Sequence, residues 1–202
     1  MIDPITKIIG TGDENIKIIE DFLDHDDWLT FINFAKSIDG KFKTDDHHPY
    51  QPLPGEIYDL VSKYRKIIVD NATKMYNLQF IDDGNELCFY VHPEGSSMIP
   101  HTDVVEEKNK TFVDYNNLDS MRSGHESVPY GWTGHLANLI YLNDNYDGGE
   151  LYFPERNITI KPKPKMLISF PGNINYLHGV SENKNATRFN LSLFIKFKDF
   201  SV

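Results

Sequence analysis

Cysteine is almost absent from this sequence, since its 202 residues contain only one, Cys88. A single cysteine cannot form an internal disulfide, which excludes a disulfide-stapled scaffold. Cys88 lies in an apolar run, LCFYV, so we expect it to be a buried thiol. A domain of this length can bury roughly 70% of its unfolded surface, and its core needs no covalent support.

Long apolar runs are also absent. No run approaches the ~18 residues of a membrane span. The first residues, MIDPITKIIGTGDEN, lack the apolar centre of a secretory signal. We therefore expect a cytoplasmic protein with no membrane partner. The hydrophobic content of 40% and the charged content of 25% are ordinary for a globular protein.

Positive charge is scarce, with 20 lysines and arginines against 30 aspartates and glutamates. The formal net charge of −10 argues against a general nucleic-acid binder, which needs a basic face to displace counterions from phosphate. We therefore expect no nucleic-acid partner. A local basic run, KPKPK at residues 161–165, is interpreted as a solvated turn between strands.

Helical patterns come first in the chain. The stretch DHDDWLTFINFAKS (residues 24–37) predicts a helix, and Asp26 or Asp27 can accept hydrogen bonds from its first backbone amides. After the helix-breaking HHPYQPLPGE, a stripe of period near 3.6 predicts a longer helix packed lengthwise against a sheet. Its members are Ile57, Leu60, Val61, Tyr64, Ile67, Ile68, Ala72 and Met75.

After Asn77 the pattern changes to short strands. LQFIDDGNELCFYVHPEG predicts a hairpin around Asp83-Gly84. Five more β-rich runs follow, HLANLIYLND, ELYFPE, NITIKP, KMLISFPG and RFNLSLFIKF, and Gly148-Gly149 are expected to permit a tight hairpin among them. Helices followed by many short strands predict a mainly β fold, a sandwich or jelly roll with supporting N-terminal helices. We expect one domain over 1–202, with helical support over about 1–78 and the β core over about 79–202.

The polar segment from Val104 to Thr133 has little periodicity. A loop this long inside a compact domain is usually functional or disordered. Because it begins directly after Asp103, we predict a lid that covers a substrate. The alternative is a disordered insertion without a role.

Three residues of the chain have the side-chain types of a metal site. His101 and Asp103 are two apart in a strand-like region, so both can point to one face. His178 follows at the end of a later strand. Two histidines and one carboxylate are the ligand set of non-haem Fe(II) oxygenases. Arg188 begins an apolar strand ten residues further on, where a guanidinium is costly unless an anion such as a dicarboxylate pairs with it.

Four motifs together carry a resemblance to a known family: His101-Thr-Asp103, then IYLNDNYDGGELYFPE, then His178, then ATRF with Arg188. In this order they resemble the prolyl-4-hydroxylase branch of the Fe(II)/2-oxoglutarate-dependent dioxygenases, over roughly Leu87 to Phe197. The resemblance implies a double-stranded β-helix, a cupin-like jelly roll. It also implies iron held by His101, Asp103 and His178, with no catalytic residue beyond this metal centre.

The resemblance further implies a 2-oxoglutarate site. Arg188 would bind the far carboxylate, Tyr141 would hydrogen-bond the same group, and Tyr90 would line the site. Collagen-type members generally carry lysine at the position of Arg188. Fe(II), 2-oxoglutarate and O2 are the implied cofactor and cosubstrates, and a use of ascorbate is compatible with them. The implied reaction hydroxylates a substrate C–H bond, a prolyl residue of a peptide or protein, and releases succinate and CO2.

Other functions stay open beside this one. A non-catalytic jelly-roll binding module keeps the fold but needs neither the triad nor a buried arginine. An oxygenase of the same superfamily could act on a non-prolyl substrate. A nucleic-acid demethylase is disfavoured because Phe194 stands where that branch carries a second arginine, and Asp103 excludes a halogenase. His92, His125 and His135 are expected to be surface or loop residues, with His135 at the beginning of a strand, and the oligomeric state is open.

Overall fold

The computed structural model describes residues 8–41, 50, 52–77, 79–81, 86–103, 135–172 and 174–197. The segment 104–133, which the sequence analysis interpreted as a lid, lies outside these residues. So do the Asp83-Gly84 turn and His125. Within the described part, two helices and two larger β-sheets form a jelly roll, which confirms the fold class predicted from the sequence.

The two large sheets contain most of the strands. The seven-stranded sheet has the order β1 (Ile8–Gly10), β2 (Lys17–Ile19), β10 (Leu167–Pro171), β6 (His135–Tyr141), β13 (Arg188–Phe197) and β3 (Phe80–Ile81), and β4 (Cys88–His92) also pairs with β13. The four-stranded sheet has the order β5 (Met98–His101), β11 (His178–Val180), β8 (Leu151–Phe153) and β9 (Ile158–Ile160). A separate ribbon pairs β7 (Asp147–Gly148) with β12 (Asn183–Lys184), and short 3-10 helices are η2 (Pro154–Arg156) and η3 (Ile174–Tyr176).

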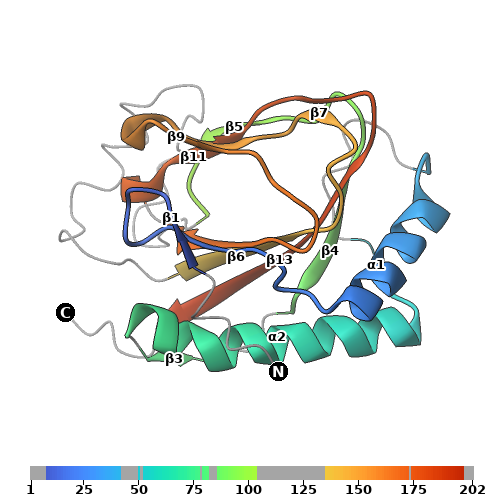
Figure 1. The fold of residues 1–202 in the computed structure, drawn as a ribbon, viewed down its shortest axis with the longest axis horizontal. Coiled ribbons are helices and arrows are strands. Elements are labelled where there is room, and N and C mark those ends of the chain that lie inside the picture. Colours follow the sequence, from blue (N-terminus) through green and yellow to red (C-terminus); the bar gives the residue numbers. More distant parts are fainter. Residues whose placement is uncertain are drawn as a thin grey trace, which may run out of the picture.

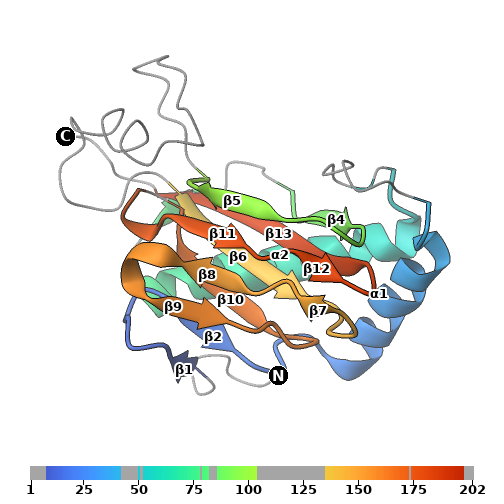
Figure 2. The ribbon, with the colours of Figure 1, turned by 90° about the horizontal axis from the view of Figure 1, so that it is seen from above.

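The molecule is built in layers (Figure 1), with the helices α1 (His25–Ile38) and α2 (Gly55–Tyr76) covering the outer face of the seven-stranded sheet. The four-stranded sheet lies on the opposite side, as the view in Figure 2 shows. One core cluster joins the helices to the seven-stranded sheet and includes Phe31, Ile68, Phe89 and Leu191. A second lies between the sheets and includes Tyr141, Leu151, Phe153, Phe170 and Val180. The functional residues therefore have to be sought between the two sheets.

The first helix begins two or three residues before its predicted cap. Asp24, with a non-helical backbone, accepts a hydrogen bond from the Asp26 amide at 3.0 Å, so the N-cap is Asp24 and not Asp26 or Asp27. Asp27 instead accepts from Lys63 and Tyr64 of α2. The buried positions of α2 follow the predicted stripe, because Ile57, Val61, Tyr64, Ile68, Ala72 and Met75 all face the core.

The predicted hairpin of the two strands around Asp83-Gly84 is wrong. Both strands pair with β13 and not with each other: β4 pairs with Arg188–Ser192, and β3 pairs with Lys196 and Phe197. Since β6 occupies the other edge of β13, β3 and β4 follow one another along a single edge. Two β-rich runs around a turn signal have here formed one interrupted strand.

The N-terminal part contains strands that the sequence analysis did not predict. β1 and β2 pair with each other, and β2 extends the seven-stranded sheet beside β10. The KPKPK run is a turn between β9 and β10, as predicted, and each of its lysines has an acidic partner. These pairs are Lys161 with Glu150, Lys163 with Glu20 and Lys165 with Asp21. None of the described helices is long and apolar enough to cross a membrane.

Candidate active site

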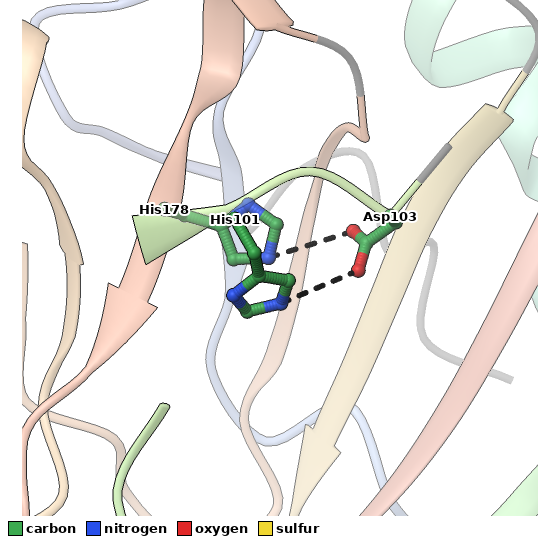
Figure 3. A group of neighbouring side chains, drawn as sticks. All are labelled: His101, Asp103 and His178. Atoms are coloured by element: carbon green, nitrogen blue, oxygen red, sulfur yellow. Dashed lines mark ion pairs between the residues drawn. The ribbon is translucent and has the colours of Figure 1, made fainter. Parts of the chain in front are cut away.

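The two histidines of the triad come from neighbouring strands. β5 and β11 are antiparallel, and His101 lies directly opposite His178 in their register. Asp103 follows β5, and its amide donates to the Gly172 carbonyl at 3.0 Å. Figure 3 shows both imidazole rings turned toward the Asp103 carboxylate. Segments 77 residues apart in sequence (101 and 178) thus bring three metal-ligating side chains together.

Backbone carbonyls fix the tautomer of both histidines. Nδ1 of His101 donates to the Ile99 carbonyl at 2.8 Å, and Nδ1 of His178 donates to the Tyr176 carbonyl at 3.0 Å. The proton on Nδ1 leaves the lone pair on Nε2, the nitrogen that faces Asp103. His101 Nε2 lies 3.8 Å from Asp103 Oδ1, and His178 Nε2 lies 3.5 Å from Oδ2. All three ligand atoms lie within 4.8 Å of one another.

Burial favours the neutral form of each of the three groups, so neither imidazole takes up a proton to pair with the carboxylate. It lowers the pKa of His178 to about 4, and it lowers the pKa of His101 with help from the neighbouring His178. Burial also raises the pKa of Asp103, against the influence of His101. Phe153 and Phe170 pack on the His178 ring, with centroids 5.9 and 4.7 Å away. A divalent cation among these atoms would compensate the buried carboxylate and use both free imidazole lone pairs.

Arg188 and Tyr141 lie on the opposite sheet, facing the same interior. Along β13, Phe189 and Leu191 join the core beneath the helices, so the alternating Arg188 points between the sheets. Arg188 is 2% exposed, and its guanidinium carbon lies 6.0 Å from the Tyr141 ring centroid. Among the described residues, Arg188 Nε and Tyr141 Oη have no hydrogen-bond partner. Buried donors of this kind are costly unless an acceptor meets them.

Tyr90 shares this inner face from the next strand. It stands opposite Asn190 in the register of β4 with β13, while its neighbours Phe89 and Val91 face the helices. Burial raises the pKa of Tyr90, and the nearby Cys88 and Asp103 add to that rise. The structure therefore brings Tyr90, Tyr141 and Arg188 to one wall and the three ligand residues to the other.

Two expectations from the sequence need correction on β4. His92 is not a surface residue: it is 6% exposed, and its ring stacks on Tyr90 at 6.0 Å. It lies opposite Arg188 in the β4–β13 register. Because side chains alternate along a strand, His92 faces the same interior as Tyr90. Cys88 is only half-buried, with Sγ 3.6 Å from the Glu86 carbonyl oxygen. His135 is the first residue of β6 and therefore lies in a strand.

Other buried polar residues near Arg188 were not predicted from the sequence. Tyr146 Oη and Asn190 Oδ1 are buried and lack hydrogen-bond partners within the described part of the chain. Asn190 could have been found, since it is an inner-face position two residues after Arg188 in the same strand. Tyr146 lies in the loop before β7, where no periodicity indicates the direction of its side chain.

Comparison with known proteins identifies the family. Residues 87–196 match the model of the 2OG-Fe(II) oxygenase superfamily, and the chain belongs to this superfamily. Enzymes of this superfamily use Fe(II), 2-oxoglutarate and O2. No curated protein matches the chain.

Solved structures with this fold include several prolyl hydroxylases. The chain is 17% identical to the viral collagen prolyl hydroxylase vCPH from Paramecium Bursaria Chlorella virus-1, solved with 2OG, at a TM-score of 0.63 over 94% of this chain and 99% of that one. A Pseudomonas putida prolyl-4-hydroxylase is 13% identical, with a TM-score of 0.59 over 92% and 94%. A Trichoplax adhaerens prolyl hydroxylase, solved with a hypoxia inducible factor peptide, is 17% identical, with a TM-score of 0.56 over 92% and 84%. At these identities the likeness is one of fold.

The residues present fit the groups that the family uses. Two neutral imidazoles and one carboxylate suit Fe(II), and they leave its other coordination positions to oxygen ligands. On the facing wall, Arg188 Nε and the Tyr141 hydroxyl can each donate a hydrogen bond and have no partner among the described residues, which suits a carboxylate.

Proposed function

We propose that this 2OG-Fe(II) oxygenase hydroxylates a prolyl residue of a peptide or protein, releasing succinate and CO2. One observation carries the proposal. His101 and His178 on one sheet, with Asp103 directly after β5, face a buried arginine on the other sheet that has no acidic partner among the described residues. The prolyl substrate is suggested by the fold shared with three prolyl hydroxylases and by the motifs of the sequence.

In this proposal His101 and His178 bind the iron through Nε2, and Asp103 binds it through a carboxylate oxygen. The Ile99 and Tyr176 carbonyls hold the rings in the orientation and tautomer that binding needs. Gly172 lets the Asp103 side chain approach closely, since a Cβ there would lie 3.0 Å from Asp103 Cβ.

Arg188 binds the far carboxylate of 2-oxoglutarate, and the Tyr141 hydroxyl donates to the same group. Tyr90 lines the same site. These groups would orient the cosubstrate for the reaction. Bound Fe(II) supplies the oxygen chemistry that oxidises 2-oxoglutarate to succinate and CO2 and adds one oxygen atom to the substrate. Phe153 and Phe170 keep water away from His178.

A non-catalytic binding module is the second candidate function for this fold. It requires no unpartnered donors, and burying them without a ligand lowers stability. The orphaned Arg188 and Tyr141 atoms therefore favour a protein that binds a small anion between its sheets.

The test measures turnover and product together. The protein is incubated with Fe(II), 2-oxoglutarate, ascorbate and proline-containing peptides, and succinate is quantified while mass spectrometry follows a gain of one oxygen atom. We expect substrate-dependent succinate and an oxygen localised to a proline. The same peptides with alanine in place of proline are the matched substrates.

Each alternative has its own outcome. Oxygen added at a residue other than proline would support the non-prolyl oxygenase. Absence of succinate with every substrate, together with no Fe(II) binding, would support the binding module. His178→Ala is the control protein, and it should form no succinate.

A further inference from the structure

Tyr146 is a buried tyrosine that the proposed function does not yet use. It lies between β6 and β7, is 3% exposed, and its hydroxyl has no hydrogen-bond partner among the residues that the structure describes. A phenylalanine would fill the same space without burying a hydroxyl that lacks an acceptor. The presence of tyrosine therefore needs a physical reason.

The side chains of Tyr146 and Arg188 both pack against Gly149. A Cβ added to Gly149 would lie 2.5 Å from Tyr146 Cε2 and 3.4 Å from Arg188 Cδ, so the two side chains meet over this glycine. Gly149 has a φ of +66°, a backbone conformation that also favours glycine. Gly148-Gly149 thus do more than shape a turn, because the second glycine lets Tyr146 and Arg188 approach each other.

Electrostatics agrees with this placement. Burial raises the pKa of Tyr146, while the Arg188 charge opposes the rise and the Tyr141 hydroxyl adds to it. Both groups can act on Tyr146 in this way only from nearby. The phenol therefore belongs to the same group of donors as Tyr141 Oη and Arg188 Nε, each of which also lacks a partner among the described residues.

Lys161 holds the Tyr146 segment from its other side. Its ammonium donates to the carbonyl oxygens of Tyr146 at 3.2 Å and of Gly148 at 2.5 Å, and lies 4.9 Å from the Tyr146 ring centroid. These contacts fix the backbone and the ring together, so the hydroxyl is preorganised before any ligand binds.

We propose that Tyr146 is a specificity-determining residue: its hydroxyl, with that of Tyr141, donates to the distal carboxylate held by Arg188, so that the site selects 2-oxo dicarboxylates over 2-oxo monocarboxylates. The inference rests on the proposed function, because it assigns a third donor to the same cosubstrate. A carboxylate offers about four lone-pair sites, so a guanidinium and two phenols can all be accommodated. A monocarboxylate would leave all three donors without an acceptor.

The experiment compares two oxo acids by calorimetric titration of the Mn(II)-loaded protein. They are 2-oxoglutarate and 2-oxovalerate, which has the same carbon chain without the distal carboxylate. Tyr146→Phe should weaken 2-oxoglutarate binding by about tenfold, because a hydrogen bond to a charged group is lost. Binding of 2-oxovalerate should change by less than about twofold, because that acid makes no such bond.

Tyr76→Phe is the matched control. Tyr76 is a tyrosine of α2 whose hydroxyl donates to Ser169 at 3.0 Å beneath the sheet. We expect Tyr76→Phe to lower the melting temperature and leave both affinities unchanged. Tyr146→Phe should not lower the melting temperature of the ligand-free protein, because its hydroxyl has no protein partner to lose.

The outcomes separate this inference from the proposed function. If the wild-type protein prefers 2-oxoglutarate and Tyr146→Phe keeps the full preference, Tyr146 only fills space and the inference is overturned. Equal weakening of both acids would also overturn it, since Tyr146 would then act away from the distal carboxylate. A wild-type protein without any preference for 2-oxoglutarate would overturn the proposed function along with it.

Discussion

At the proposed metal site, each histidine is oriented by a carbonyl two residues before it. Ile99 does this for His101, and Tyr176 does it for His178. Both carbonyls belong to the backbone, so no single side-chain substitution removes either acceptor. The orientation of the two Nε2 atoms is consequently a property of the backbone, in β5 for His101 and at the end of η3 for His178, whereas the Asp103 carboxylate depends on the residues around it.

Gly172 is the residue on which the position of Asp103 depends. We expect Gly172→Ala to lower metal affinity by about tenfold or more, the range seen when groups that orient metal ligands are changed. The added methyl would stand 3.0 Å from Asp103 Cβ and 3.1 Å from Oδ2, and would push the carboxylate aside. Mn(II) titration followed by electron paramagnetic resonance measures the affinity.

Gly55→Ala is the control for this substitution. An added Cβ at Gly55 meets nothing within 4 Å, and the residue starts α2. It should leave metal affinity unchanged and keep or raise stability, because alanine favours helices. Equal metal affinity of Gly172→Ala and the wild-type protein would show that Asp103 tolerates the displacement or is not a ligand.

Arg188 should favour the binding of 2-oxoglutarate and lower the stability of the ligand-free protein. Replacing it by methionine removes a buried charge that has no acidic partner among the described residues. The ligand-free protein should therefore become more stable, by about 1–4 kcal/mol. Binding of 2-oxoglutarate should weaken by about 2–5 kcal/mol, since the carboxylate loses its charged partner. Urea denaturation and calorimetry measure the two effects, and a loss of stability in the ligand-free Arg188→Met protein would contradict this account.

The sequence was sufficient to select candidate site residues by their type and spacing, but it did not show what surrounds each side chain. His101, Asp103, His178 and Arg188 were selected because their types and spacing match a known chemistry, and the structure places them in one interior. Tyr146 could not be selected in this way. Its importance depends on an approach across Gly149 that brings together residues about 40 positions apart (146 and 188). His92 was misjudged because its burial follows from the pairing of β4 with β13.

The pairing of elements was harder to predict than their existence. The β-rich runs became strands, but a turn signal such as Asp83-Gly84 says only where the chain can bend, and not which strand it joins next. β3 and β4 both pair with β13. β1 and β2 were missed because three-residue strands are too short to show an alternation.

The contact between α1 and α2 includes a polar junction at Tyr64. Its hydroxyl donates to Asp27 Oδ2 at 2.7 Å and accepts from the Asp24 amide at 2.9 Å. Tyr64→Phe should lower stability at pH 7 by about 1–3 kcal/mol, because the half-buried Asp27 carboxylate and the Asp24 amide each lose a hydrogen bond. Urea denaturation of the two proteins measures the difference.

The effect of this substitution should depend on pH. Burial opposes ionisation of Asp27, but the hydrogen bonds from Lys63 and Tyr64 outweigh it and hold the pKa of Asp27 below its usual 3.8. A depressed pKa in the folded state stabilises above the unfolded value and is lost as the pH falls through the folded one. The difference in the free energy of unfolding between the wild-type protein and Tyr64→Phe should therefore decrease as the pH falls below about 4. A constant difference would show that the Asp24 amide, and not Asp27, accounts for the effect.

Across the whole molecule, the proposed ligands connect the two sheets. His101 and His178 belong to β5 and β11 of the smaller sheet, with Asp103 directly after β5, and Arg188 and Tyr141 belong to β13 and β6 of the larger one. A ligand that binds both walls stabilises the folded state in proportion to its occupancy. At a concentration of about 100 Kd the gain is about 2.7 kcal/mol, which for a chain of this size raises the Tm by about 5–10 °C.

Thermal unfolding with Mn(II) and 2-oxoglutarate, added singly and together, tests whether the two ligands bind together between the sheets. We expect the pair to raise the Tm by more than the sum of the two single additions, because the oxo acid needs the metal at one end and Arg188 at the other. His101→Ala should abolish the shift from Mn(II). Purely additive shifts would indicate that the metal and the oxo acid bind at separate places.

The position of β13 has a consequence for how the protein comes to be made. β13 is the last of the described strands, yet it lies inside the seven-stranded sheet, between β6 on one edge and β3 and β4 on the other. During synthesis, those three strands emerge from the ribosome before their common partner. The edges that later pair with β13 are unpaired until it is synthesised. Unpaired strand edges of this kind favour aggregation or the binding of chaperones. Since β13 also carries Arg188, the proposed anion site is completed only when the sheet closes, and a chain stalled before residue 188 should bind chaperones and have no activity.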